Sequence, residues 1–325
     1  MNEPNEELTA VLSADQPTPI SPSATAQVLL EQDDQIAVRQ LSQLQLTWIR
    51  FRRHKVAMAG AVILLFFVVV AIFGPLISPE SYYQVNQNAL FQPPTWSWRY
   101  LMGADADGHA VMMWVILGAR PSLEIGFLSA GLATVIGIIV GAVSGYFGGF
   151  VDAVCMRVTD VFLTLPFLPL LLLLGSIIGG GNVWFIVVVF GVLGWSGSAR
   201  LIRSYYLTFR QQEFTEAARA VGVSSTRIIF RHILPNALSP IIVSFTLLVA
   251  AFIVTEAAID FLGQGLKPPS VSWGLALAGA QSYTLLGIWW WMVFPGACLL
   301  LVVLAVNFIG DGLRDALDVR AKTVD

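Results

Sequence analysis

Long stretches without a single charged side chain constrain this sequence more than any other feature. Four of them occupy residues 56–77, 125–147, 233–255 and 288–310. An α-helix rises 1.5 Å per residue, so about 20 apolar residues cross the ~30 Å hydrocarbon layer of a bilayer. A fifth run, residues 161–199, is too long for one crossing, and the turn-forming residues 179–182 divide it in two. We therefore expect about six transmembrane helices.

Composition agrees with a chain that folds in lipid. Hydrophobic residues make up 56% of its 325 positions and charged residues only 12%, about half the charged share of a typical soluble domain. A single water-soluble core would struggle to bury that much apolar sequence. We predict an all-α integral membrane protein.

Lysine and arginine fall mostly on one side of the predicted spans. If the N-terminus is cytoplasmic, the segments at the cytoplasmic face carry 15 of the 18 basic side chains, and the outer segments carry only Arg99, Arg120 and Lys267. Basic residues favour the cytoplasmic side of short loops. We therefore expect a multi-pass protein of the cytoplasmic (inner) membrane, with both termini in the cytoplasm. The outer loops would be residues 78–121, 179–182 and 256–287.

The N-terminal region has a different composition. Its first 47 residues hold seven acidic side chains, four prolines and one arginine, so we expect residues 1–34 to be a disordered acidic tail. Residues 35–55 carry apolar side chains at helical spacing, from Leu41 to Phe51, beside a basic cluster, which predicts an amphipathic helix on the membrane surface. An N-terminal extension of the first span fits the pattern equally well.

The rest of the chain divides into a first span with its outer loop (56–121), a transmembrane core (122–311) and a cytoplasmic tail (312–325).

Small residues and two acids stand out within the spans. Gly137, Gly141 and Gly145 recur every fourth residue, a spacing that lets another helix pack closely against this one. Glu256 and Asp260 lie near the outer end of the fifth span. They are candidates for an outer mouth that contacts substrate, but capping of the span and bonds to loop backbone explain them better.

Signals for catalysis or metal binding are absent from the sequence. His54, His109 and His232 are far apart, and the two cysteines form no C-x-x-C pair, so we predict no metal site. No phosphate-binding loop of the form G-x-x-x-x-G-K-[ST] occurs, so any ATPase must be another chain. The scarcity of charge in the spans also counts against an ion-coupled secondary carrier. We expect no enzyme activity, no cofactor bound by this chain and no nucleic-acid partner.

The longest basic segment between spans predicts two short helices joined by a turn. Strong helix formers and a Glu216–Arg219 pair at i,i+3 precede Gly222, which stops the first helix, and Ser224 or Ser225 can cap the second. Small residues flanked by charges would let a partner protein approach closely. An ordinary amphipathic loop is the alternative.

Several stretches of this sequence resemble one family of transport proteins. The segment EAARAVGVSSTRIIFRHILPN is similar to the EAA loop of ABC importer permeases, and the segments NFIGDGLRDALDVR, EAAIDFLGQGLKPPSVSWG, SGYFGG and LGARPSLEIG are similar to signatures of the oligopeptide, dipeptide and nickel permease family. The resemblance covers most of residues 100–320. It implies the C-type permease of a pair, with the type I ABC importer permease fold and a cytoplasmic coupling helix. Its ATPase-coupling loop would contain Glu213, Glu216, Ala217, Ala218, Arg219, Gly222, Arg227, His232 and Pro235.

The resemblance also implies partners and a substrate class. A second homologous permease would complete the pathway, two ATP-binding subunits would bind ATP and Mg, and an extracytoplasmic solute-binding protein would deliver the solute. Membrane lipid surrounds such a chain. Dipeptides or oligopeptides are the expected cargo, with nickel chelates and glutathione-like solutes as alternatives. A membrane scaffold without a transport role is a further alternative, for which the basic face would only bind anionic lipid.

One segment departs from the family pattern. Members commonly carry G-T-D-x-x-G-R-D before the second span, whereas this chain reads GADADGHA at residues 103–110. His109 stands where the pattern has arginine, and alanine replaces its threonine and second aspartate. The usual contacts of this outer segment are therefore expected to differ here.

Overall fold

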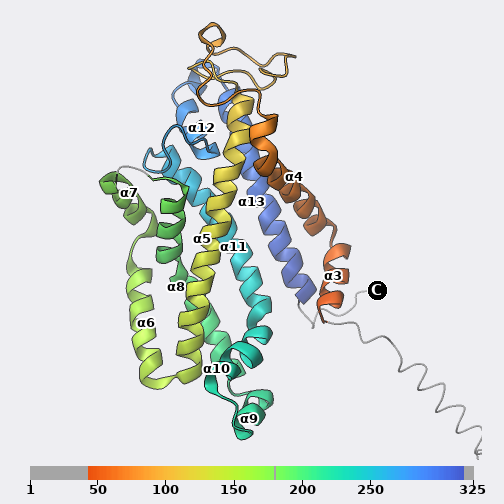
Figure 1. Ribbon diagram of the computed structural model, residues 1–325, viewed down its shortest axis with the longest axis vertical. Coiled ribbons are helices and arrows are strands. Elements are labelled where there is room, and N and C mark those ends of the chain that lie inside the picture. Colours follow the sequence, from red (N-terminus) through yellow and green to blue (C-terminus); the bar gives the residue numbers. More distant parts are fainter. Residues whose placement is uncertain (1–42, 179–180, 318–325) are drawn as a thin grey trace, which may run out of the picture. The chain divides into compact units, whose positions relative to one another are not determined.

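Helices form nearly all regular structure in the residues that the computed structural model describes, 43–178 and 181–317 (Figure 1). The residues from Thr47 onward form one compact unit. The long helices are α4 (Lys55–Ile77), α5 (Val111–Phe147), α8 (Val183–Phe209), α11 (Leu234–Phe261) and α13 (Trp290–Leu317). The shorter elements are α3 (Gln43–Arg53), η1 (Gln87–Ala89), α6 (Gly149–Thr164), α7 (Phe167–Ile178), α9 (Glu213–Ala220), α10 (Ser225–Arg227), η2 (Ile228–Ile233), α12 (Trp273–Ala280) and η3 (Thr284–Leu286).

The predicted all-α membrane architecture is confirmed. Five helices in the described residues are long and apolar enough to cross a membrane, or six if the bent pair α6–α7 counts as one span. That pair bends by 75°, so the expected straight span beginning at residue 161 is wrong. Leu165 has extended backbone angles, because the following Pro166 disfavours helical geometry in the residue before it.

The second span begins earlier than the sequence predicted. α5 starts at Val111 instead of residue 125, so the outer loop ends near residue 110. Pro121 lies inside the helix. Arg120 and Glu124 form an i,i+4 ion pair at 2.7 Å, which lets one helix carry two charges close to the apolar run.

The N-terminal elements are two helices with a break between them. His54 separates α3 from α4 and caps α4, with its Nδ1 accepting a hydrogen bond of 3.1 Å from the backbone N–H of Ala57. A continuous extension of the first span is therefore not observed. The predicted disordered tail 1–34, the first part of the amphipathic segment 35–55 and residues 318–325 lie outside the described residues.

Close backbone contact joins α5 to α8, which run side by side (Figure 1). Gly137, Gly141 and Gly145 all face α8. A methyl group added at Gly141 would lie 2.5 Å from the carbonyl oxygen of Ala199 and 3.0 Å from the amide nitrogen of Arg203. Because these are backbone atoms, they cannot rotate away. The absence of side chains on this stripe sets the distance between the two helices.

The two acids near the outer end of α11 lie inside the protein. Glu256 and Asp260 have no exposed surface, so neither reaches an outer mouth in this structure. Asp260 accepts hydrogen bonds from the Leu266 amide, at 2.6 Å, and from the Ser272 hydroxyl. Glu256 accepts a bond of 3.2 Å from the hydroxyl of Ser122 on α5. These bonds fix the segment after α11 against the bundle.

A buried polar cluster closes the outer segment ahead of α5. Both ring nitrogens of His109 face acceptors: Nδ1 lies 3.1 Å from Asp105 Oδ2, and Nε2 lies 2.9 Å from the carbonyl oxygen of Tyr82. Asp105 also accepts from the indole N–H of Trp114, at 2.8 Å. Only the doubly protonated imidazolium donates to both acceptors, so His109 can replace the two-sided donor that an arginine would supply.

Protonation of His109 stabilises this cluster. The hydrogen bond to Asp105 is the main cause that raises the pKa of His109 above 6.5, burial opposes it, and the charges of Asp105 and Asp107 add to it. Because the pKa is higher in the folded state, the stabilisation is complete below the unfolded pKa of about 6.5. It is lost as pH rises through the raised folded pKa.

We predict that the outer segment 80–110 loosens as pH rises from about 5.5 to about 8.5. Hydrogen exchange of these residues, corrected for the intrinsic pH dependence, should increase in the wild type. In His109→Arg the charge persists at every pH tested, so protection should stay constant. An equal rise in exchange for both proteins would contradict this role of His109.

We also predict that Gly141→Ala destabilises the protein by about 1–3 kcal/mol, because the methyl group overpacks the α5–α8 contact. Gly131→Ala is the matched control in the same helix, where an added methyl meets no atom within 4 Å. Thermal unfolding in detergent should show a lower midpoint for Gly141→Ala alone. Equal midpoints for the two variants would show that the contact is not tight.

Candidate docking surface at the α9–α10 turn

Gly222 ends α9 through its backbone conformation. Its φ is +79°, in the left-handed region that glycine adopts without steric cost. The Val223 amide donates to the Ala218 carbonyl at 3.1 Å, and the Gly222 amide donates to the Arg219 carbonyl at 3.0 Å. This is the Schellman arrangement that closes helix C-termini. No atom lies within 4 Å of a methyl added at Gly222, so this chain requires glycine there for its conformation and not for space.

Two residues hold α9 against the rest of the protein. Thr215 is buried and donates a hydrogen bond of 2.8 Å to the carbonyl oxygen of Phe209, at the end of α8. Ala218 is also buried, which corrects the expected small-residue surface of Ala217, Ala218 and Gly222. Positions 215 and 218 are three apart and share the inward side of the helix. Of the three small residues, only Ala217 and Gly222 are exposed.

The outward side of α9 presents apolar side chains among charges. Val221 is 81% exposed and Phe214 is 38% exposed. Glu213 and Glu216, both exposed, flank them. Exposed apolar side chains rimmed by charge mark protein interaction sites, so this surface, called the α9 face below, can bind a partner protein.

The predicted Glu216–Arg219 ion pair does not form among the described residues. The guanidinium carbon of Arg219 instead lies 6.0 Å from the ring centroid of Tyr146, within range of a cation–π interaction. Glu216 therefore lies exposed on the α9 face without Arg219 as a partner.

The second part of the turn continues directly into a span. Ser224 occupies the N-cap position of α10 but makes no side-chain capping bond, and the π-helical turn η2 connects α10 to α11. Arg227 is exposed on α10, His232 is half-buried in η2, and Pro235 lies exposed in the first turn of α11. A displacement of the turn would thus reach α11 without an intervening flexible loop.

Two tyrosines behind the turn connect it to the α5–α8 pair. The fully buried Tyr206 of α8 donates its hydroxyl to the Ile229 carbonyl in η2, at 3.1 Å. The Tyr146 hydroxyl of α5 lies 3.4 Å from the Ser225 hydroxyl. The turn is therefore attached to α5, α8 and α11 together.

An ion pair reinforces the same region. Arg203 of α8 donates two hydrogen bonds of 2.5 Å to the two carboxylate oxygens of Asp152 in α6. The Ser144 hydroxyl also donates to Asp152. The guanidinium group of Arg210 donates to the backbone carbonyls of Gly145 and Tyr146, each at 3.4 Å. Paired guanidinium and carboxylate groups of this geometry hold helices in fixed positions.

Sequence reasoning missed most of these supporting residues. It listed the charged and small residues of the loop but not Phe214 and Val221, nor Tyr206 and the Asp152–Arg203 pair. The segment SGYFGG held a usable signal, because Ser144 and Tyr146 lie within it. Residue types alone did not reveal which α9 positions face outward.

One group of possible metal ligands occurs elsewhere, in the outer segment. Ligand atoms of Asp105, Asp107 and His109 lie within 4.8 Å of one another. Both nitrogens of His109 already face protein acceptors, so in this arrangement His109 offers no free nitrogen to a metal ion.

Comparisons with known proteins agree with these features. Residues 133–323 match the family described as binding-protein-dependent transport system inner membrane component, and residues 42–94 match the N-terminal TM domain of oligopeptide transport permease C. The dipeptide transport system permease protein DppC of Bacillus subtilis is 38% identical over 289 residues, with 89% of each chain covered. The oligopeptide transport system permease protein OppC of Mycobacterium bovis is 38% identical over 277 residues, which cover 85% of this chain and 94% of that protein.

A solved structure shows the same fold. A chain from the MetNI methionine ABC transporter, in inward facing conformations, superposes with a TM-score of 0.50 at 21% sequence identity. The match covers 63% of this chain and 97% of that chain.

We predict that Asp152→Asn destabilises the protein by about 1–3 kcal/mol, because Arg203 loses a charged partner at a mostly buried site. The control is Asp160→Asn, whose partner Arg200 lies 2.7 Å away in a half-exposed pair. Such exposed pairs contribute only about 0–1 kcal/mol. Thermal unfolding in detergent, with hydrogen exchange of residues 225–233, measures both effects; equal losses would argue against a special role for the Asp152–Arg203 pair.

Proposed function

The chain belongs to the family of binding-protein-dependent transport system inner membrane components, and from this premise we propose that it is the pathway-forming permease of an ATP-driven peptide importer. Membership and fold confirm the resemblance drawn from the motifs, including the type I ABC permease fold. Members of this kind are membrane components of ABC importers and not enzymes, so they associate with other transporter components.

The exposed α9 face is the observation that carries the proposal. An apolar side chain such as Val221, 81% exposed at a turn between two spans, gains free energy when a partner covers it. Glu213 and Glu216 would orient that partner electrostatically. We assign the partner as an ATP-binding subunit, and we assign α9 as the coupling helix that this subunit binds.

Transmission through the turn would be mechanical. A push on α9 reaches α8 through the Thr215–Phe209 hydrogen bond and reaches α11 through η2. Tyr206 joins the two routes by its bond to Ile229. In this proposal, closure of two ATP-binding subunits around ATP and Mg tilts α8 and α11 and so changes which side of the membrane the pathway faces. No residue of this chain needs a catalytic role.

Orientation, partners and cargo complete the proposal. The excess of basic residues beside α9 supports a cytoplasmic position for that end and for both termini. A second homologous permease would form the other wall of the pathway, and an extracytoplasmic solute-binding protein would deliver the solute. The names of the relatives, a dipeptide and an oligopeptide permease, support peptides as cargo over nickel chelates or glutathione-like solutes.

An ion-coupled carrier is the main competing function. Such carriers use ionisable groups at membrane depth, and Glu256 and Asp260 are buried carboxylates. Asp260, however, is bonded to a loop amide and a hydroxyl, and these bonds suit a structural role. Transport that survives ATP depletion and stops when the ion gradient collapses would favour the carrier.

We predict that Val221→Asn lowers uptake of a labelled dipeptide about tenfold, because it removes a central apolar contact with the ATP-binding subunit. The permease should still insert and still assemble with its paired permease. Uptake is measured in cells that lack other dipeptide transporters, and the ATP-binding subunit retained on the purified permease is quantified alongside it.

Val151→Asn is the matched control, since it makes the same change at a position 38% exposed on α6 and outside the α9 face. It should retain both uptake and the ATP-binding subunit. Normal uptake in Val221→Asn, or equal losses in both variants, would refute docking at the α9 face.

A further inference from the structure

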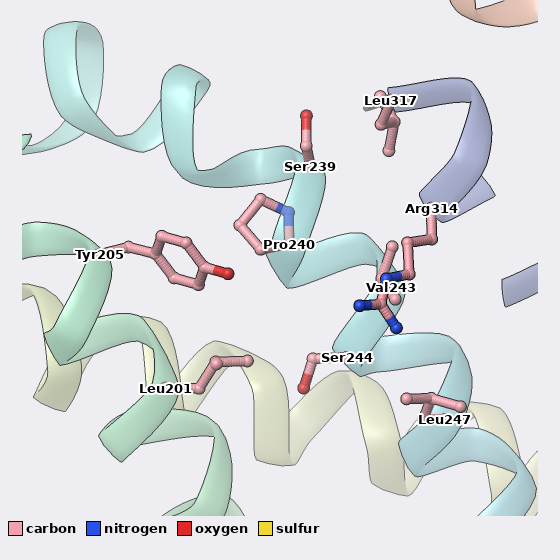
Figure 2. Close-up of a pocket in the computed structure, with 9 residues that line it drawn as sticks. All are labelled: Leu201, Tyr205, Ser239, Pro240, Val243, Ser244, Leu247, Arg314 and Leu317. Atoms are coloured by element: carbon pink, nitrogen blue, oxygen red, sulfur yellow. The ribbon is translucent and has the colours of Figure 1, made fainter. Parts of the chain in front are cut away.

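A pocket of about 480 Å³ opens between α8, α11 and α13, on the part of α11 that follows η2 (Figure 2). Its size falls within the range of small-molecule sites. Its walls combine apolar and polar side chains from three helices: Leu201, Tyr205, Ser239, Pro240, Val243, Ser244, Leu247, Arg314 and Leu317.

The hydroxyl groups in this pocket have no partner within the described part of the chain. Tyr205, Ser239 and Ser244 form no side-chain hydrogen bond there. By contrast, Ser204 and Thr246, on the same two helices, donate to backbone carbonyls of their own helix at 2.6 and 2.8 Å. The hydroxyls lining the pocket are therefore available to a ligand, whereas their neighbours are not.

Arg314 adds an unpaired positive charge. Its guanidinium group forms no ion pair or hydrogen bond with any described residue, and no carboxylate lines the pocket. Arg314 also borders a second cleft toward α4, which Asp311 and Asp315 line, and there Asp315 lies 3.4 Å from the ring of His54. Figure 2 shows the Arg314 side chain running from α13 toward Val243 of α11.

Arg314 is exposed, so its N–H donors are open to water or to a polar ligand. The hydroxyls of the pocket lie between spans, where hydrocarbon would leave them unsatisfied at high cost, so they also need water or a polar ligand. A guanidinium group with free N–H donors binds carboxylates strongly. Hydroxyls both donate and accept, so they match a molecule that carries both N–H and C=O groups. The apolar side chains of Leu201, Val243 and Leu247 suit an uncharged side chain beside them.

We infer that this pocket is a subsite for the C-terminal end of a short peptide, with Arg314 binding the peptide's terminal carboxylate. The three hydroxyls bond to its last amide groups, and the apolar wall accepts its last side chain. The inference rests on the proposed peptide-import function and adds one binding contact for its cargo. Arg314 is thereby a binding residue, and no chemical step occurs there.

An anionic phospholipid is a weaker match to the same pocket. Its phosphate would satisfy Arg314 and accept from the hydroxyls, but a phospholipid such as phosphatidylglycerol has no amide N–H groups and no side chain to fill the apolar wall. The test below therefore treats lipid occupancy as an outcome against the inference.

The experiment measures peptide binding to the assembled transporter in nanodiscs, without the solute-binding protein. The probes are fluorescently labelled trialanine with a free carboxylate and the same peptide as a carboxamide. The wild type should bind the free acid about tenfold or more tightly than the amide. Arg314→Gln should bind the two peptides alike. Arg314→Lys keeps the charge but not the planar guanidinium, so its preference for the free acid should lie between those of the wild type and Arg314→Gln.

Arg157→Gln is the matched control, because Arg157 is an exposed arginine on α6 outside the pocket. It should retain the wild-type preference for the free acid. A preference that persists in Arg314→Gln would overturn the inference. So would phosphatidylglycerol that copurifies with the wild type, displaces the peptide and is lost in Arg314→Gln.

Failure of this inference is distinguishable from failure of the proposed function. Wild-type uptake that does not depend on ATP refutes the importer itself. ATP-dependent uptake with equal binding of acid and amide refutes only the carboxylate subsite.

Discussion

The close contact between α5 and α8 is the constraint on which the rest of the structure depends. Its glycine stripe brings the two backbones so near that even one methyl group at Gly141 has no room, so neither helix can shift alone. Tyr146 and Tyr206 project from this contact and hold the α9–α10 turn. The turn is therefore an extension of the packed core, and a force applied to α9 must move whole helices.

Both ends of the bundle combine bonded polar groups with polar groups that have no partner in the described residues. At the outer end, Asp260 and Asp105 are buried, and their carboxylates accept several bonds from nearby loops. At the α9 end, Arg314 and the pocket hydroxyls stay unpaired. Satisfied buried polar groups rigidify a region, whereas unpaired ones need an external partner. The outer end is thus rigid around Asp260 and Asp105, although one carboxylate oxygen of Glu256 has no partner in the described residues. The α9 end joins the bonded Asp152–Arg203 pair to an open pocket that can receive water or solute.

Features governed by lipid could be predicted from the sequence, and features governed by packing could not. Uncharged runs located the spans because charge is costly in hydrocarbon, and Gly222 marked the end of α9 because few other residues adopt its φ. The early start of α5 was missed because Arg120 and Glu124 neutralise each other within the helix. The inward position of Ala218 and the exposure of Phe214 depend on how an eight-residue helix is rotated. That rotation is set by Thr215 and its bond to α8, a tertiary contact without a sequence pattern of its own.

Two walls of the pocket belong to α8 and α11, the long helices before and after α9 in the chain, and this connects the two proposals physically. Tyr205 of the pocket precedes Tyr206, whose hydroxyl holds the turn. Ser239 lies on the α11 segment that continues from η2 without a loop. A tilt that moves α9 must therefore change the spacing of the pocket walls. The affinity of the pocket for a peptide carboxylate would then change with the state of the ATP-binding subunits, as release of cargo requires.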